Sequence, residues 1–177
     1  EQFLLNVGTI ETRKNLLLIV QALRELPENI ELVVVGRETA YTTAVKNYID
    51  QHNLGSRVHF LKDVAYADLP LIYQQAKIFV YPSRFEGFGI PIIEALHSGV
   101  PVIAATGSCL EEAGGSNSLY VNPDNAFELA QSVSQVFSDE GLRTKMIDAG
   151  RQHVRQFSAD KISQQLNDIY HQVLNNA

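Results

Sequence analysis

The sequence predicts an α/β domain built on a doubly wound parallel sheet. Two observations support this fold class: apolar strand-like runs alternate with amphipathic helical stretches along the chain, and the runs are continuous in Val, Ile and Leu. Continuous apolar strands between helices are typical of parallel sheets that are covered on both faces. A chain of 177 residues, 45% of them hydrophobic, also has the size of one globular domain with a sizeable core.

The first half of the chain predicts three strands that each precede a helix, and then a fourth strand. In order we expect a strand at 3–8, a helix at 15–26, a strand at 30–36, a helix at 40–52, a short strand at 57–61, a helix at 67–75 with Asp68 near its cap, and a strand at 78–81. The fourth strand is the best defined, because Ile78-Phe79-Val80-Tyr81 is β-branched and aromatic and ends at Pro82.

The second half begins with a short predicted helix at 90–97 that has clear signals at both ends. Pro91 falls in its first turn, where a missing N–H costs nothing, and Gly99 and Pro101 stop it. A strand at 100–104, a turn at 106–108, a short strand at 118–121 and helices at about 125–138, 140–156 and 159–175 follow. We expect one domain over residues 1–177, with the last helix packed partly outside the core.

Composition and charge argue against several function classes. A net charge of −6, with 14 scattered Lys and Arg residues, provides no basic surface for nucleic acid. The single cysteine, Cys109, cannot form an internal disulfide, which suits a reducing cytosol. The five histidines lack partners at metal-ligand spacing and no Asp-x-Asp sequence occurs, so we expect neither a metal nor another cofactor. The motifs of serine hydrolases and P-loop nucleoside triphosphatases are also missing.

The start of the chain is unusual for a complete protein. It opens almost directly with an apolar strand, and its only methionine is Met146. We therefore expect a fragment whose preceding part has been removed. No stretch approaches the roughly 20 apolar residues that span a bilayer, so we expect no transmembrane segment in this chain.

The most informative pattern lies in residues 83–101. Two carboxylates, Glu86 and Glu94, stand on either side of a turn with two glycines, Gly87 and Gly89, which leads into the predicted helix. We expect both glycines to permit backbone angles and close approach that a Cβ would block.

The start of this helix is a predicted anion site. A helix start exposes unpaired N–H groups and the positive end of the helix dipole, which together favour phosphate. The amides of Phe88, Gly89 and Ile90 are therefore expected to bind phosphate and sugar.

Two carboxylates beside a phosphate site are electrostatically unfavourable unless they bind neutral hydroxyl groups of the ligand. An ionised carboxylate only accepts hydrogen bonds, and its two oxygens can bind a vicinal diol of a ribose or hexose ring. We therefore assign Glu94 to a ribose and Glu86 to the hydroxyls of a sugar. The alternative is that Glu86 caps the helix and that Glu94 lies on its solvated face.

The loop after the first strand supplies positive charge through Arg13 and Lys14. A guanidinium and an ammonium can neutralise the charge of a phosphorylated ligand. Positive charge at a helix N-terminus opposes the helix dipole, which favours a ligand role. The alternative is a solvated helix start.

Together these residues resemble the C-terminal nucleotide-sugar-binding domain of GT-B glycosyltransferases, specifically the large retaining family 4. The segments that carry the resemblance are Val7–Asn15, Val34–Gly36, Tyr81–Pro101 and Gly107–Gly114, and it covers nearly the whole chain. It implies a Rossmann-like fold and donor contacts by Gly8 and Lys14. Thr9 stands where the family has arginine and Asn15 where glycine is commoner, so Arg13 is a candidate substitute for that arginine.

Weaker candidates follow other strands. Arg37 and Glu38 either border the site or begin the next connection. Ser83 either reaches the phosphates or caps the turn after Pro82.

The resemblance adds two further segments. It implies that residues 61–64, with Val64 at their end, hold the base partly through backbone groups. It also implies that one of Glu111 and Glu112 ends a short helix near the crevice. The alternative for both glutamates is an exposed acidic turn.

The function implied is that of a retaining hexosyltransferase domain. It would bind a UDP-, GDP- or ADP-sugar and, in the intact cytoplasmic enzyme, pass the sugar to an acceptor in glycan or glycolipid synthesis, with Glu86, Lys14 and Arg13 as catalytic residues. The acceptor site is expected on a missing N-terminal domain, so the isolated chain should transfer little. Peripheral association of the whole protein with the inner face of a membrane stays open.

Two alternative functions stay open. One is a non-catalytic nucleotide-sugar-binding module. The other is a GT-B-like sugar-nucleotide epimerase, which needs acid–base groups at the sugar carbon for which the sequence offers no His or Asp candidate.

Overall fold

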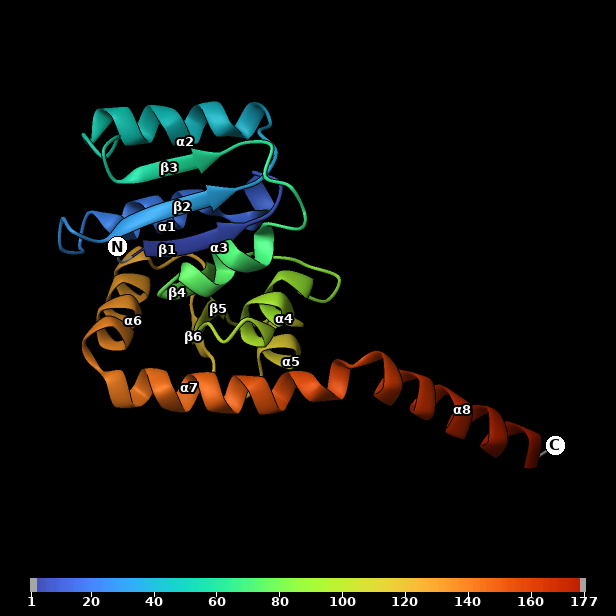
Figure 1. Ribbon diagram of the computed structural model, residues 1–177. Helices are drawn as coiled ribbons and strands as arrows, with labels where there is room; N and C mark the ends of the chain where they lie inside the picture. Colours follow the sequence, from blue (N-terminus) through green and yellow to red (C-terminus); the bar gives the residue numbers. More distant parts are fainter. Residues whose placement is uncertain (1–2, 176–177) are drawn as a thin grey trace.

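A six-stranded parallel sheet runs through the protein in a computed structural model that describes residues 3–175 (Figure 1). The strand order is β3-β2-β1-β4-β5-β6, and every neighbouring pair is parallel. The strands are β1 (Phe3–Val7), β2 (Glu31–Val35), β3 (Val58–Leu61), β4 (Ile78–Tyr81), β5 (Val102–Ala105) and β6 (Leu119–Val121). Strand order reverses between β1 and β4, so the predicted doubly wound, Rossmann-like α/β fold is confirmed.

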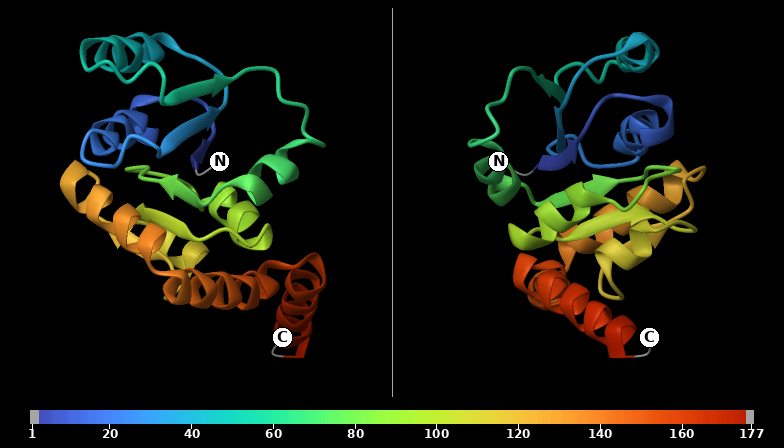
Figure 2. Two further views of the ribbon diagram at one scale, coloured as in Figure 1. Left: turned by 60° about the vertical axis from the view of Figure 1, so that its left-hand side comes forward. Right: turned by 90° about the vertical axis from the view of Figure 1, so that its right-hand side faces the viewer.

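Helices cover both faces of the sheet (Figure 2). One face packs against α1 (Leu16–Leu23), α2 (Ala40–Gln51) and α6 (Ala126–Ser138), and the other against α3 (Leu69–Gln75), α4 (Ile90–His97) and α5 (Leu110–Gly114). Successive strand residues point to opposite faces. Leu4 therefore joins one core cluster and Leu5 the other, and Ile78 and Phe79 divide in the same way. Burial on both faces explains why the strands are apolar without alternation.

The boundaries of the predicted elements agree with the structure to within a few residues. The strand at 78–81 and the helix at 90–97 are found with the bounds expected. The predicted helix at 140–156 is wrong at its end, because α7 (Glu140–His153) tightens into the 3-10 helix η2 (Val154–Phe157). The 3-10 helix η1 (Thr12–Lys14) was not expected. Such short turns lack the periodicity that makes a longer helix recognisable.

The last helix, α8 (Ala159–Asn175), extends away from the sheet (Figure 1). Every side chain from Ser158 to Leu174 is exposed. Its large apolar residues recur at spacings of three and four, which places them on one face of the helix; they are Ile162, Leu166, Ile169, Tyr170, Val173 and Leu174. None of the helices in residues 3–175 is long and apolar enough to cross a membrane.

Two glycines bring the ends of β1 and β2 into close contact. The amide of Gly8 donates to the carbonyl of Val35 over 2.9 Å. A Cβ on Gly36 would overlap the carbonyl oxygen of Gly8. The carboxyl edge of the sheet therefore has no room for a side chain at this position.

We expect Gly36→Ala to lower the free energy of unfolding by about 1–3 kcal/mol, because the added methyl group meets backbone that cannot rotate away. Urea denaturation measures this loss. Gly55→Ala is the matched control, since no atom lies within 4 Å of the position its Cβ would take. Equal stability of the two variants would contradict the close contact.

Candidate functional site

The candidate site lies at the carboxyl ends of the strands, where strand order reverses between β1 and β4. In open α/β sheets this crevice is where ligands bind. The loop after β1 and the loop after β4 are tied together there. The Arg84 amide donates to the Arg13 carbonyl over 2.8 Å, and the Asn15 side chain donates to the Pro82 carbonyl over 3.3 Å. Residues that are about 70 positions apart in the sequence thus form one wall.

Glu86 is the most densely bonded side chain of this wall, and it is only 12% exposed. Its Oε1 accepts from the hydroxyls of Tyr81 and Ser83 over 2.8 and 2.9 Å. The guanidinium of Arg13 lies 2.8 Å from the same oxygen and the ammonium of Lys14 lies 4.0 Å from it. Burial alone would raise the pKa of Glu86, but the bonds from Arg13, Tyr81 and Ser83 outweigh it and lower that pKa below its ordinary value.

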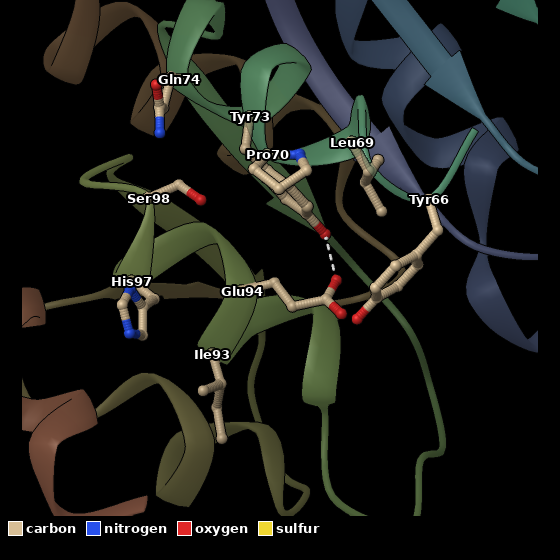
Figure 3. Close-up of a pocket in the computed structure, with 9 residues that line it drawn as sticks. All are labelled: Tyr66, Leu69, Pro70, Tyr73, Gln74, Ile93, Glu94, His97 and Ser98. Carbon is tan, nitrogen blue, oxygen red and sulfur yellow. Dashed lines mark hydrogen bonds between the residues drawn. The ribbon is translucent and has the colours of Figure 1, made fainter. Parts of the chain in front are cut away.

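Glu94 lies on α4 and faces a cavity of about 400 Å³ between α3 and α4 (Figure 3). The buried Tyr73 donates from its hydroxyl to Glu94 Oε2 over 2.9 Å. Figure 3 shows this bond, with the ring of Tyr66 on the other side of the carboxylate. The cavity is lined by Tyr66, Leu69, Pro70, Tyr73, Gln74, Ile93, Glu94, His97 and Ser98. The two motif glutamates therefore face different partners.

In the part of the chain that the structure describes, one carboxylate oxygen of each glutamate accepts no hydrogen bond. All the bonds to Glu86 reach Oε1, and the bond to Glu94 reaches Oε2. Within residues 3–175, no hydrogen bond reaches Oε2 of Glu86 or Oε1 of Glu94. Ionised carboxylates accept several hydrogen bonds, so both can bind hydroxyl donors of a ligand.

The turn between the glutamates requires only one of its glycines. Gly89 has φ +108°, and a Cβ there would lie 3.0 Å from the side chain of Leu110 in α5. Gly87 has no positive φ and no atom within 4 Å of a Cβ, so the expectation of a special conformation there is wrong. Phe88 anchors the turn through an edge-on contact with Phe157, at 5.3 Å between ring centroids.

The turn also presents free amides. In the described part of the chain, no hydrogen bond uses the amides of Phe88, Gly89 or Ile90. Gly89 is the N-cap of α4 and Pro91 occupies its first turn, as the sequence predicts. The two unpaired amides of the turn and the first amide of α4 are therefore available to an anion.

The loop after β1 folds its cations back over the sheet. Lys14 passes over Gly8, since a Cβ on Gly8 would lie 2.5 Å from Lys14 Nζ, and its ammonium lies 5.5 Å from the centre of the Tyr81 ring. Arg13 also donates to Glu11 and to the Phe85 carbonyl. Positive charge is thereby concentrated next to Glu86.

The backbone conformation of residue 15 explains why asparagine can stand at a position where the resembling family more often has glycine. Asn15 has φ 58° and ψ 36°, in the left-handed region. Asparagine adopts this conformation more readily than other residues with a side chain. Its side chain also donates to the Pro123 carbonyl over 2.8 Å, a bond that glycine could not make.

The weaker candidates lie in different surroundings. Ser83 is fully buried and donates to Glu86, so its hydroxyl supports a carboxylate. Arg37 and Val64 line a second cavity of about 550 Å³ at the ends of β2 and β3. Glu111 and Glu112 are both exposed, and Glu111 accepts from the hydroxyl of Thr106 over 2.7 Å. Both acids lie in the first turn of the short helix α5, so the expectation that one of them ends this helix is wrong.

Sequence reasoning missed Tyr73 and Tyr81 as partners of the glutamates. A signal was present for Tyr81, since a buried tyrosine hydroxyl usually finds a partner and Glu86 follows five residues later. No local signal links Tyr73 to Glu94, because 21 residues separate them.

Comparison with protein families and curated proteins gives consistent matches. The family described as Glycosyl transferases group 1 matches residues 1–153. O-antigen chain mannosyltransferase B of Escherichia coli is 30% identical over 172 residues, which cover 95% of this chain and 45% of that protein. O-antigen chain mannosyltransferase RfbU of Salmonella typhimurium is 34% identical over 136 residues, covering 77% and 38%. The chain thus spans less than half the length of these relatives.

Solved structures match as well. Sucrose-phosphate synthase from Thermosynechococcus elongatus is similar with a TM-score of 0.89 at 28% identity, over 100% of this chain and 46% of that one. Anabaena Alr3699/HepE, solved in complex with UDP and glucose, is similar with a TM-score of 0.87 at 22% identity, over 96% and 48%. At 22% identity, the similarity to Anabaena Alr3699/HepE shows a shared fold only.

The lowered pKa of Glu86 leads to a prediction for acid unfolding. A carboxyl whose folded-state pKa lies below the unfolded value near 4.5 stabilises the protein above that pH, and this contribution is lost as the pH falls through the folded pKa. We expect the difference in unfolding free energy between wild type and Glu86→Gln to be constant near neutral pH and to change below about pH 4.5. Urea denaturation at a series of pH values measures it.

Arg13→Met is the companion variant. It removes a donor that lowers the pKa of Glu86, so the acid-induced loss should move to higher pH. If the difference in unfolding free energy between wild type and Glu86→Gln is the same at every pH, the pKa of Glu86 is not lowered in the folded protein.

Proposed function

The chain belongs to the glycosyl transferases group 1 family, and from this membership we propose that it is the domain that binds the sugar donor, a nucleoside-diphosphate sugar. One observation carries the proposal. Glu86 and Glu94 flank the amides of Phe88–Ile90, next to the cations of Arg13 and Lys14; within residues 3–175 these amides and one oxygen of each carboxylate make no hydrogen bond. A donor of this kind combines two sets of ring hydroxyls with a diphosphate between them, and along residues 86–94 an acceptor, the amide donors and a second acceptor follow one another in the same order.

The role of each group follows from its chemistry. Glu94 accepts hydrogen bonds from the ribose, and Glu86 accepts them from the transferred sugar. The amides of Phe88–Ile90 and the ammonium of Lys14 bind the diphosphate, and Arg13 adds a second cation. Charge builds up on the diphosphate as the sugar leaves, so these donors accelerate the reaction by stabilising the leaving group. We propose that they do so without a divalent cation, and that Gly8, Arg37 and Val64 complete the donor site.

For the whole protein we propose a retaining hexosyltransferase of family 4, with this chain as its C-terminal half. The curated relatives are about twice as long, which leaves room for an N-terminal domain that holds the acceptor. The exposed apolar face of α8 is a surface that such a domain could cover. The names of these relatives support glycan synthesis, with transfer in the cytoplasm or at the inner face of a membrane. The isolated chain should bind a donor and transfer little.

Titration of the chain with UDP, GDP and ADP by calorimetry tests the proposal. At least one of them should bind, and Glu94→Ala should weaken that binding by about 1–3 kcal/mol, because hydrogen bonds to the ribose are lost. Glu25→Ala, at an exposed position beyond α1, is the control and should leave the affinity unchanged. An unchanged affinity in Glu94→Ala would remove Glu94 from the ribose role. Binding by the full-length protein without turnover of any sugar nucleotide would favour a non-catalytic binding module.

The role of Lys14 is tested with a nucleoside and its diphosphate. Lys14→Met should weaken binding of the diphosphate by about 1.5–3 kcal/mol, the range for a hydrogen bond to a charged group, and leave binding of the nucleoside unchanged. Lys145→Met removes an exposed ammonium on α7 and is the control. An equal loss for nucleoside and diphosphate would show that Lys14 supports the loop rather than the phosphates.

A further inference from the structure

Two buried tyrosines hold the two motif glutamates. Tyr81 donates to Glu86 over 2.8 Å, and Tyr73 donates to Glu94 over 2.9 Å. We propose that Tyr73 and Tyr81 are positioning residues, which turn one oxygen of each glutamate toward the ligand by holding the other. This inference rests on the proposed donor site and adds two residues to it that act through the glutamates.

The tyrosines belong to one cluster of aromatic rings under α4, in which Phe79 and Tyr81 are stacked and Tyr73 is tilted against Phe79. Phe79 and Tyr81 are two apart on β4, so both point to the same face of the sheet. Their ring centroids lie 5.7 Å apart with nearly parallel planes, and Tyr73 from α3 lies 5.4 Å from Phe79. All three side chains are at most 1% exposed. Close packing on every side leaves the two hydroxyls little freedom to move.

Burial also decides which way the hydrogen bonds run. Burial, and next the charge of Glu94, raises the pKa of Tyr73. Burial, and next the hydrogen bond to Glu86, raises the pKa of Tyr81. Both hydroxyls therefore keep their protons and act as donors to the carboxylates. Each donates its single proton to one oxygen, and the other oxygen stays open to ligand hydroxyls.

The two glutamates differ in how much they depend on their tyrosine. Glu86 Oε1 is also held by Ser83 and Arg13, so Tyr81 is one of several supports. The hydroxyl of Tyr73 is the one hydrogen-bond donor to Glu94 within residues 3–175. Without it, the terminal torsion of Glu94 is free to rotate between broad minima. Binding of the ribose should therefore depend more strongly on Tyr73 than binding of the transferred sugar depends on Tyr81.

Tyr73→Phe tests this, because it removes the hydroxyl and keeps the ring that packs against Phe79. The probes are the nucleoside diphosphate that binds best among UDP, GDP and ADP, and its 2′,3′-dideoxy counterpart, titrated by calorimetry. Wild type should prefer the ribonucleotide. In Tyr73→Phe this preference should fall by about fivefold, while the affinity for the dideoxy probe stays the same. A loss of general stability would instead weaken both probes together.

Three further variants make the test specific. Tyr81→Phe should leave the preference for the ribonucleotide unchanged. It should reduce the extra affinity with which a nucleoside-diphosphate sugar binds compared with the nucleoside diphosphate alone. Tyr120→Phe is the matched control, since its half-buried hydroxyl donates to the backbone carbonyls of Gly115 and Glu111, over 2.7 and 3.3 Å, and in residues 3–175 to no carboxylate. In a Glu94→Ala background, Tyr73→Phe should cause no further loss of ribose preference if it acts through Glu94.

The outcomes separate this inference from the proposed function. If the wild-type chain binds none of the three nucleotides, the donor-site proposal fails and the inference fails with it. If nucleotides bind but Tyr73→Phe retains the full ribose preference, or lowers both probes equally, the positioning role is overturned and the donor site stands. Thermal melting of each variant shows whether it is folded at the temperature of the titration.

Discussion

The buried charge of Glu86 is the interaction on which the crevice depends. A carboxylate that is only 12% exposed must be hydrogen-bonded and paired, or it becomes too costly to keep ionised. Its partners come from both sides of the crevice: Tyr81 and Ser83 from the end of β4, and Arg13 and Lys14 from the loop after β1. One charged group thus joins the two loops at the point where strand order reverses. A charged, hydroxylated ligand in the crevice would contact this same cluster of side chains.

Backbone geometry allows these loops to approach so closely. Gly8 leaves room for the side chain of Lys14, and Gly36 lets the end of β2 pass beside Gly8. Asn15 turns the chain from η1 into α1 through a left-handed conformation and pins the turn with its side chain. Gly89 makes the corresponding turn into α4 and leaves space for α5. Steric constraints of single residues therefore set where the cations and the free amides lie.

The strand β4 links the core to the crevice. Its residues alternate between the two core clusters, so that Ile78 and Val80 pack under α1 and α6 while Phe79 and Tyr81 pack under α4. Tyr81 is therefore at once a core residue and a hydrogen-bond donor to Glu86. This double role means that the packing of the sheet and the orientation of the motif carboxylates are coupled. The exposed helix α8 has no such part in the crevice.

The sequence by itself determined the fold class, the strand at 78–81, the helix at 90–97 and the pair of glutamates around its start. These features are local, since hydrophobic periodicity, glycine and proline set them within a few residues. Only the tertiary structure decided which groups meet: Arg13 with Glu86, Tyr73 with Glu94, and the unexpected need for glycine at 89 but not at 87. Such contacts depend on the strand order that brings β1 beside β4, and a local pattern contains no information about a partner that lies 20 or 70 residues away.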